Sequence, residues 1–87
     1  MLSVNQIKAE DRINFEWKKA LDKIKENAGN GISKTEILFP KDIFFECRKR
    51  LNNWMDENKV NYGWMDLGGM MSLDYGTHRF MKFNLKQ

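Results

Sequence analysis

The sequence contains very little cysteine or histidine and no long apolar run. Cys47 is the only cysteine and His78 the only histidine. One cysteine excludes a disulfide within the chain, and the two residues together are too few for a zinc site made of Cys and His. The longest uninterrupted apolar run is three residues, as in Ile37–Leu38–Phe39, whereas a membrane-spanning helix needs about 20. We therefore expect no metal, no cofactor and no membrane insertion.

The beginning of the chain does not have the pattern of a secretory signal. Residues 1–20 carry charges throughout and contain no apolar core, whereas such signals have a continuous apolar stretch. The low cysteine content also suits a reducing compartment. We expect the protein to act in the cytoplasm.

The composition is typical of one small folded domain. Of the 87 residues, 41% are hydrophobic and 13% aromatic, and disordered chains are poorer in aromatic residues. Fifteen Lys and Arg against twelve Asp and Glu give a net charge of +3. This excess is mild for a nucleic-acid-binding protein, so the distribution of charge matters more than its total. We expect a single compact domain over residues 1–87.

The spacing of apolar residues predicts an α+β fold. Helical periodicity runs over about residues 4–28 and again over about 41–58, where Pro40 fits the first turn. Between and after the helices, strands are expected at about 32–39, 60–65, 70–75 and 77–85, with Gly76 as a break. The order α-β-α-β-β, with a possible extra strand, favours two amphipathic helices packed on a small, mainly antiparallel sheet. A winged helix is the alternative, but residues 29–40 leave little room for its third helix.

Basic residues follow one face of the first predicted helix. Lys8, Arg12, Lys19 and Lys23 fall within about 60° on a helical wheel, with Phe15 at the edge of that sector. Positive charge beside an exposed aromatic ring suits a phosphate backbone and an unstacked base. The alternative is a solvated helix face that Glu16 and Glu26 partly neutralise.

The last predicted strand offers a second basic patch. Phe80 and Lys82 share its outer face if Met81 and Phe83 are core residues. An aromatic ring and a lysine on an open sheet face can stack on and neutralise a single strand. With Arg79, these residues are the second half of the predicted nucleic-acid site; ordinary sheet packing is the alternative.

Aromatic and methionine side chains flank the turn at Gly68–Gly69. Methionine adapts to irregular partners, and aromatic residues are enriched at interfaces. The same side chains could equally fill a small core. The predicted protein interface consists of Tyr62, Trp64, Met65, Met70 and Met71.

Nothing in the sequence builds a catalytic site. His78 has no serine or cysteine near it in sequence, and Gly68–Gly69 lacks the spacing and the lysine of a phosphate-binding loop. Cys47 lies on the apolar face of the second helix, where we expect it to be buried. The sequence therefore predicts that the protein is not an enzyme and has no catalytic residues.

The whole chain resembles a group of small viral proteins. The features are Phe15-x-Trp17 in a basic first helix, its end at residues 27–31, Tyr62–Gly63 before a terminal hairpin, and richness in Lys and Asn. In these respects it is similar to the small early accessory proteins of T4-type bacteriophages, and in particular to the TifA-type inhibitors of the ToxIN toxin–antitoxin system. The resemblance spans most of the chain and rests on its length, on the order of its predicted elements and on its composition, so no single functional residue is carried over.

That resemblance implies a non-enzymatic counter-defence inhibitor. It would bind a host protein, a toxin endoribonuclease, in the host-cell cytoplasm, with RNA bound through basic surfaces. Two alternatives remain: a protein-only interaction module, and a small phage structural or assembly protein. Six methionines and several aromatic residues are also compatible with a homo-oligomer.

Overall fold

Two helices and a four-stranded antiparallel sheet make up this computed structural model, which describes residues 4–70 and 72–86, with side chains from Lys8 onward. The predicted α+β fold with two helices on a small sheet is confirmed, and the possible extra strand is present. The elements in order are α1 (Val4–Gly29), β1 (Lys34–Pro40), the 3-10 helix η1 (Lys41–Ile43), α2 (Phe44–Glu57), β2 (Tyr62–Trp64), β3 (Leu73–Tyr75) and β4 (His78–Leu85).

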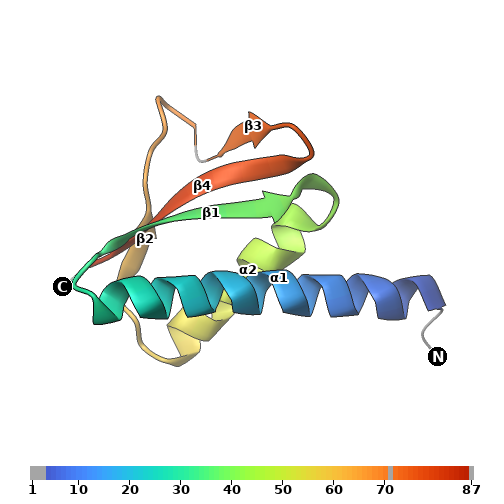
Figure 1. The fold of residues 1–87 in the computed structure, drawn as a ribbon, viewed down its shortest axis with the longest axis horizontal. Helices are drawn as coiled ribbons and strands as arrows, with labels where there is room; N and C mark the ends of the chain where they lie inside the picture. The colour runs from blue at the N-terminus through green and yellow to red at the C-terminus, as the bar shows by residue number, and fades with distance from the viewer. Residues whose placement is uncertain (1–3, 71, 87) are drawn as a thin grey trace.

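All the other strands pair with β4. Along one edge β1 runs antiparallel to it, from Lys34 opposite Asn84 to Pro40 opposite His78. Along the other edge β2 pairs with the end of β4 and β3 with its beginning. In Figure 1, β4 lies between β1 and β3, α2 lies behind the sheet, and α1 runs alongside β1.

Alternation along the strands decides which face of the sheet is covered. The side chains of β1 are buried at every second position. Ile37 lies opposite Met81 and Thr35 opposite Phe83, and all four are buried, so they share one face. Because successive side chains of a strand point to opposite faces, Leu38 belongs to the other face, where it is exposed.

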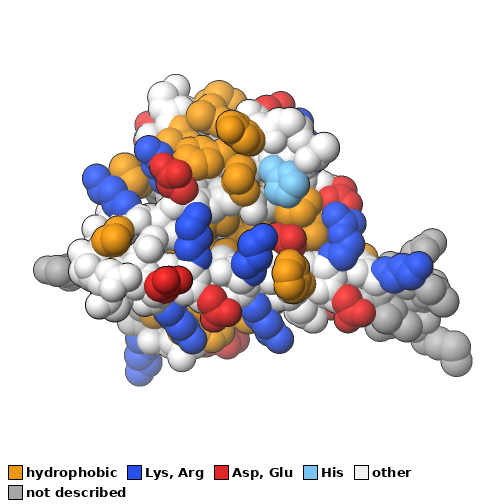
Figure 2. Space-filling model, in the orientation of Figure 1, with side chains coloured by type: hydrophobic (Ala, Val, Ile, Leu, Met, Phe, Trp, Pro, Cys, Tyr) orange, Lys and Arg blue, Asp and Glu red, His pale blue; other side chains and the backbone are white. Residues whose placement is uncertain are grey.

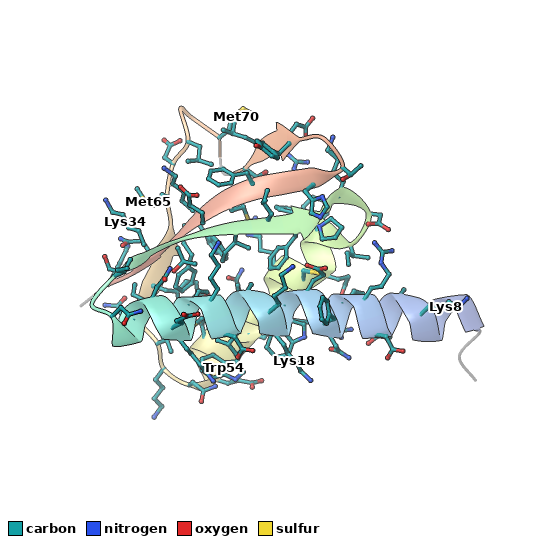
Figure 3. All side chains as sticks on the ribbon, in the orientation of Figure 1. Lys8, Lys18, Lys34, Trp54, Met65 and Met70 are labelled. Atoms are coloured by element: carbon teal, nitrogen blue, oxygen red, sulfur yellow. The ribbon has the colours of Figure 1, made fainter. Side chains whose placement is uncertain are left out.

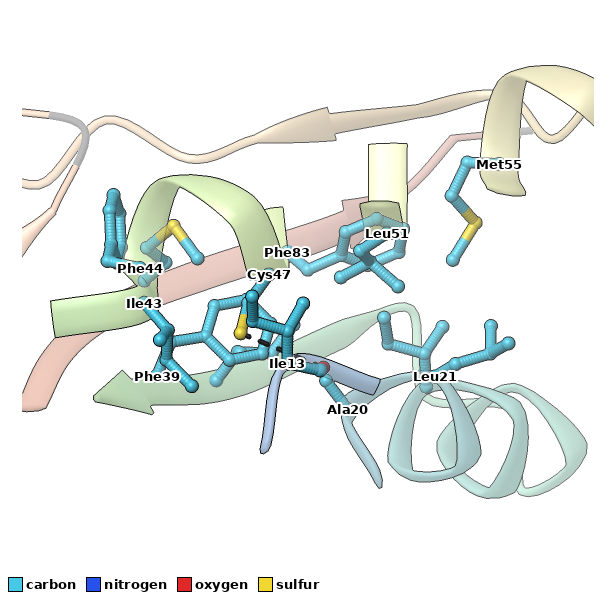
Figure 4. Close-up of a cluster of buried hydrophobic side chains, with 13 residues drawn as sticks. Ile13, Ala20, Leu21, Phe39, Ile43, Phe44, Cys47, Leu51, Met55 and Phe83 are labelled. Carbon is cyan, nitrogen blue, oxygen red and sulfur yellow. Dashed lines mark hydrogen bonds between the residues drawn. The ribbon is translucent and has the colours of Figure 1, made fainter. Parts of the chain in front are cut away.

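The helices cover the first face with apolar side chains spaced at helical intervals (Figure 4). Phe83 is fully buried beneath them; its ring stacks on Tyr62 at 5.5 Å and meets Trp64 edge-on at 5.3 Å. Such ring pairs stabilise beyond the area they bury. The helical part of the core consists of Ile13, Ala20, Leu21 and Ile24 from α1, and of Phe44, Cys47, Leu51 and Met55 from α2.

The connections after α1 and β1 fix how the helices approach the sheet. Gly31 has a φ of +77°, a left-handed conformation that glycine adopts without strain, and the Asn27 side chain donates to Thr35 Oγ1 at 3.0 Å. Pro40 was expected in the first turn of the second helix, but it ends β1, because η1 lies between the strand and α2. The Lys41 N–H donates to the Thr77 carbonyl at 3.0 Å and holds this corner against the β3–β4 turn.

Ion pairs join α1 to η1 and to α2. The Arg50 guanidinium donates to both carboxylate oxygens of Glu10, at 2.7 and 2.8 Å, and to Asn14. Arg12 donates to both oxygens of Asp42, at 2.7 and 3.1 Å, and thereby lowers the pKa of that carboxyl. The Arg12–Asp42 pair is a fork-shaped contact, the geometry in which arginine binds carboxylates best, whereas Arg50 reaches both Glu10 oxygens through Nη2 alone.

We expect Phe83→Ala to lower the free energy of unfolding by about 3–5 kcal/mol, because it removes a fully buried ring and its contacts with Tyr62 and Trp64. Urea denaturation followed by circular dichroism measures the change. Phe45→Ala serves as a control, since that ring is 74% exposed and its loss should change the stability by about 0.5 kcal/mol or less. Equal losses in the two variants would contradict this account of the core.

The buried thiol of Cys47 predicts a specific dependence of stability on pH. Its Sγ is fully buried, 3.9 Å from the Ile13 carbonyl, and burial raises the pKa of the thiol from 9.0 to about 12. Above pH 9 the unfolded chain therefore releases a proton that the folded chain keeps, so stability falls as the pH rises from 9 toward 12.

Between pH 8 and pH 10 we expect the wild type to lose roughly 1.4 kcal/mol more stability than Cys47→Ala, which has no thiol to ionise. Urea titrations of both proteins under reducing conditions measure this difference. The cavity left by the substitution lowers the stability of the variant at every pH and cancels from the comparison. Parallel pH profiles would show that the folded thiol ionises normally.

Candidate nucleic-acid interface

The sheet face turned away from α2 carries accessible apolar side chains. Leu38 is 43% exposed, Leu73 40% and Tyr75 69%, and Phe80 is half-buried among them. The register places Leu38 and Leu73 on either side of Phe80, so the three residues form a row across three strands. Figure 2 shows the apolar side chains gathered over this part of the sheet, with His78 beside them and cationic side chains between them and α1.

A groove separates this row from α1. Two adjoining hollows of 820 and 200 Å³ form it, and both are lined by Glu16, Lys19 and Leu38. The first hollow ends at Tyr75 and His78 of the β3–β4 hairpin. We call the two hollows together the sheet groove, and the residues that define this groove are Glu16, Lys19, Lys23, Leu38, Tyr75 and Phe80.

Lysines from three elements border the sheet groove. Lys19 and Lys23 come from α1, and a further hollow that continues past Lys23 is lined by Lys34 of β1 and Lys82 of β4. Lys23 Nζ also donates to the Glu36 carbonyl at 2.7 Å. This bond occupies a carbonyl on the edge of β1 that does not pair with β4, so Lys23 both caps a strand edge and places its charge beside the groove.

Carboxylates interrupt this positive border. Glu16 and Glu36 line the groove, and Asp74 lies at the hairpin end, where its carboxylate is 3.6 Å from Lys41 Nζ. Glu36 lies opposite Lys82 in the register of β1 and β4. The groove is therefore a mixed surface, with an apolar and aromatic floor, four lysines and a small number of acids.

The structure brings together some of the predicted nucleic-acid residues. Lys19, Lys23, Phe80 and Lys82 all line the sheet groove or its continuation. Phe15 is 65% exposed and lies beside Lys19, whose Nζ is 5.7 Å from its ring centroid. The helix stripe and the last strand, predicted as two patches, therefore meet along one groove.

Other predicted residues lie elsewhere. Arg79 was grouped with Phe80 and Lys82, which is wrong: its side chain points to the helix-covered face, with its guanidinium 5.2 Å from the Phe44 ring. Strand alternation separates it from its two neighbours. Arg12 is held by Asp42, and Lys8 lies on the part of α1 that extends beyond the sheet (Figure 3).

The predicted protein interface is not one exposed surface. Tyr62 and Trp64 are half-buried against Phe83, and their polar atoms bond within the chain: the Tyr62 hydroxyl with Asp56, and Trp64 Nε1 with Asn52. Met65 is half-buried and Met70 is 54% exposed; Figure 3 shows both beside the sheet. Met71 lies outside the described residues.

Sequence reasoning missed an exposed aromatic on the outer side of α2. Phe45 is 74% exposed, and a shallow hollow beside it is lined by Arg48, Lys49, Asn52 and Asn53. Its ring is edge-on to Phe44 at 5.3 Å, and the Arg48 guanidinium lies 5.6 Å from the Trp64 ring. The signal was present in the sequence, since Phe45 lies outside the apolar stripe that contains Phe44 and Cys47. We call the hollow and its five lining residues the Phe45 surface: Phe45, Arg48, Lys49, Asn52 and Asn53.

Sequence reasoning also missed Leu38, Leu73 and Tyr75. Leu38 occupies a position of β1 at which alternation calls for a polar residue, because Ile37 and Phe39 take the buried positions. That departure from the pattern was a readable signal. The exposure of Leu73 and Tyr75 depends on their pairing with β4, which the sequence does not state.

No protein-family model, curated protein or solved structure matches this chain. Within residues 4–70 and 72–86, no helix is both long and apolar enough to cross a membrane. The same part of the chain contains no group of three or more His, Cys, Asp or Glu side chains placed to hold a metal ion. The sheet groove and the Phe45 surface are therefore the candidate binding sites of the described residues.

Proposed function

We propose that this protein is a non-enzymatic RNA-binding inhibitor that holds single-stranded RNA in the sheet groove. The observation that carries the proposal is the row of Leu38, Phe80 and Leu73 on an open sheet face with lysines along its border. Bases that are not paired can stack on such a floor while lysines contact the phosphates. A duplex would leave the aromatic floor unused, because its bases are already stacked.

The proposed setting is host takeover by a bacteriophage. The resemblance to small phage accessory proteins supports it, and the target would be an endoribonuclease toxin of a host toxin–antitoxin system. Such a toxin itself handles RNA, so a protein that binds RNA on one side can contact the toxin with another. The mild net charge of +3 agrees with a protein that has both a nucleic-acid partner and a protein partner.

Charge reversal at the groove tests the RNA contact. We expect Lys19→Glu combined with Lys82→Glu to weaken binding of a labelled single-stranded RNA and to lower the slope of log affinity against log salt by about 1.4, since each phosphate contact on a single strand contributes about 0.7. Fluorescence anisotropy across a salt series measures both. Lys23 is left intact because it also bonds to the Glu36 carbonyl.

The matched control reverses Lys18 and Lys49, which changes the net charge equally. Lys18 lies on the side of α1 away from the groove (Figure 3), and Lys49 lies on the Phe45 surface. We expect this control to keep most of the affinity and the wild-type salt slope. Equal losses in the two double variants would mean that RNA responds only to overall charge, which would contradict a site in the groove.

The exposed Phe45 favours protein binding as a second activity, through the Phe45 surface. An accessible aromatic ring beside an arginine is the composition of a binding hot spot. We expect Phe45→Ala to weaken association with a purified endoribonuclease toxin by about 30-fold, corresponding to a loss of about 2 kcal/mol, while leaving RNA affinity unchanged. Calorimetry with nuclease-treated components measures the association.

Ile32→Ala is the control, because Ile32 is also exposed, at 48%, but lies in the connection between α1 and β1. Its removal should leave association with the toxin unchanged. If Phe45→Ala binds the toxin as tightly as the wild type, the Phe45 surface is not the protein contact.

A further inference from the structure

We propose that the sheet groove selects a guanine base in the bound strand, and that Glu16 is the residue that recognises it. This inference rests on the proposed function, since it concerns the same groove and the same RNA. Phosphate binding does not explain Glu16, a carboxylate in the middle of a groove bordered by lysines.

The position of Glu16 is central to the groove. It lines both hollows, as do Lys19 and Leu38. Its side chain is half-buried, and it makes no ion pair within 4.0 Å among the described residues. Arg12, one helical turn earlier, is already bound through both ends of its fork to Asp42. Glu16 is therefore free to accept hydrogen bonds from a ligand.

The chemistry of a carboxylate separates guanine from the other bases. An ionised carboxylate accepts hydrogen bonds through two oxygens and donates none. The Watson–Crick edge of guanine presents two adjacent donors, N1–H and the N2 amino group, which match those two oxygens. Adenine, cytosine and uracil each place an acceptor next to the donor on that edge, and a carboxylate repels it.

Neighbouring residues complete such a pocket. Lys19 follows Glu16 by three residues on α1, so the two side chains lie on the same side of the helix, and its ammonium suits the guanine O6 acceptor. Leu38 supplies the apolar floor beneath them, and the 69% exposed ring of Tyr75 lines the same hollow at its hairpin end. A base in this hollow would have an aromatic ring to stack on and both edge partners within one helical turn.

The experiment compares short oligouridines that carry one central guanine, adenine, cytosine or hypoxanthine. Hypoxanthine lacks the N2 amino group and so tests one of the two donors. Anisotropy at low salt should show the guanine strand binding about tenfold tighter than the adenine, cytosine and all-uridine strands, with hypoxanthine between them. Glu16→Gln should reduce the preference to about twofold or less while still binding every strand, because the amide offers only one acceptor.

Glu57→Gln is the matched control, since Glu57 is an exposed carboxylate at the end of α2; it should keep the full preference for guanine. Free guanosine monophosphate should displace the strand only at far higher concentration, because it offers one phosphate to the lysines. If it competes as well as the oligonucleotide, the ligand is a free nucleotide and the assignment to a strand is overturned.

The remaining outcomes separate this inference from the function on which it rests. If the wild type binds all the strands equally, guanine selection is wrong and RNA binding stands. If Glu16→Gln keeps the wild-type preference, Glu16 is not the recognising residue. If no strand binds at low salt, both the selection and the proposed RNA-binding function are overturned.

Discussion

Every other strand of the sheet pairs with β4, and this pairing determines which side chains enter the core and which stay on the open face. Its register with β1 sets Met81 and Phe83 beneath the helices, and the same register places Phe80 and Lys82 on the opposite face. A shift of one residue would exchange these two sets and expose the fully buried Phe83 to water. Because burial of that ring under Tyr62 and Trp64 stabilises only one register, the core determines which side chains remain available for binding.

The position of α1 turns the open sheet face into a groove. The helix buries one side in the core through residues such as Ile24 and presents Glu16, Lys19 and Lys23 to the other face. Two ion pairs hold α1 in place, Arg12 of α1 with Asp42 and Arg50 of α2 with Glu10 of α1, and Lys23 bonds to the edge of β1. One helix thus closes the core, protects a strand edge and supplies one wall of the candidate site.

The Phe45 surface lies on α2, which covers the opposite face, so an RNA and a protein partner would meet different sides of the molecule.

Much of this arrangement could be predicted from local pattern alone. The helical periodicity that includes Ile13 and Leu21 predicted α1, and alternation in the last strand correctly placed Phe80 and Lys82 together. The same alternation places Arg79 on the face of Met81, opposite Phe80 and Lys82, and the structure shows Arg79 on that helix-covered face.

Pairing between distant segments was the part that the sequence could not supply. It decides that Tyr62 and Trp64 pack on Phe83 rather than face a partner, and that Leu73 joins Leu38 beside Phe80. Arg50 shows the same limit, because it binds Glu10, 40 residues away in the chain.

We propose that RNA binds on the helix-free face of the sheet. The most direct measurement is an NMR titration of the labelled protein with a short single-stranded RNA, following the backbone amides and the aromatic side chains. Binding on this face predicts that shifts concentrate at Leu38, Phe80, Tyr75 and the neighbouring residues of α1, and that Phe45 and the outer side of α2 are unchanged. Shifts confined to α2, or spread evenly over every basic residue, would contradict it.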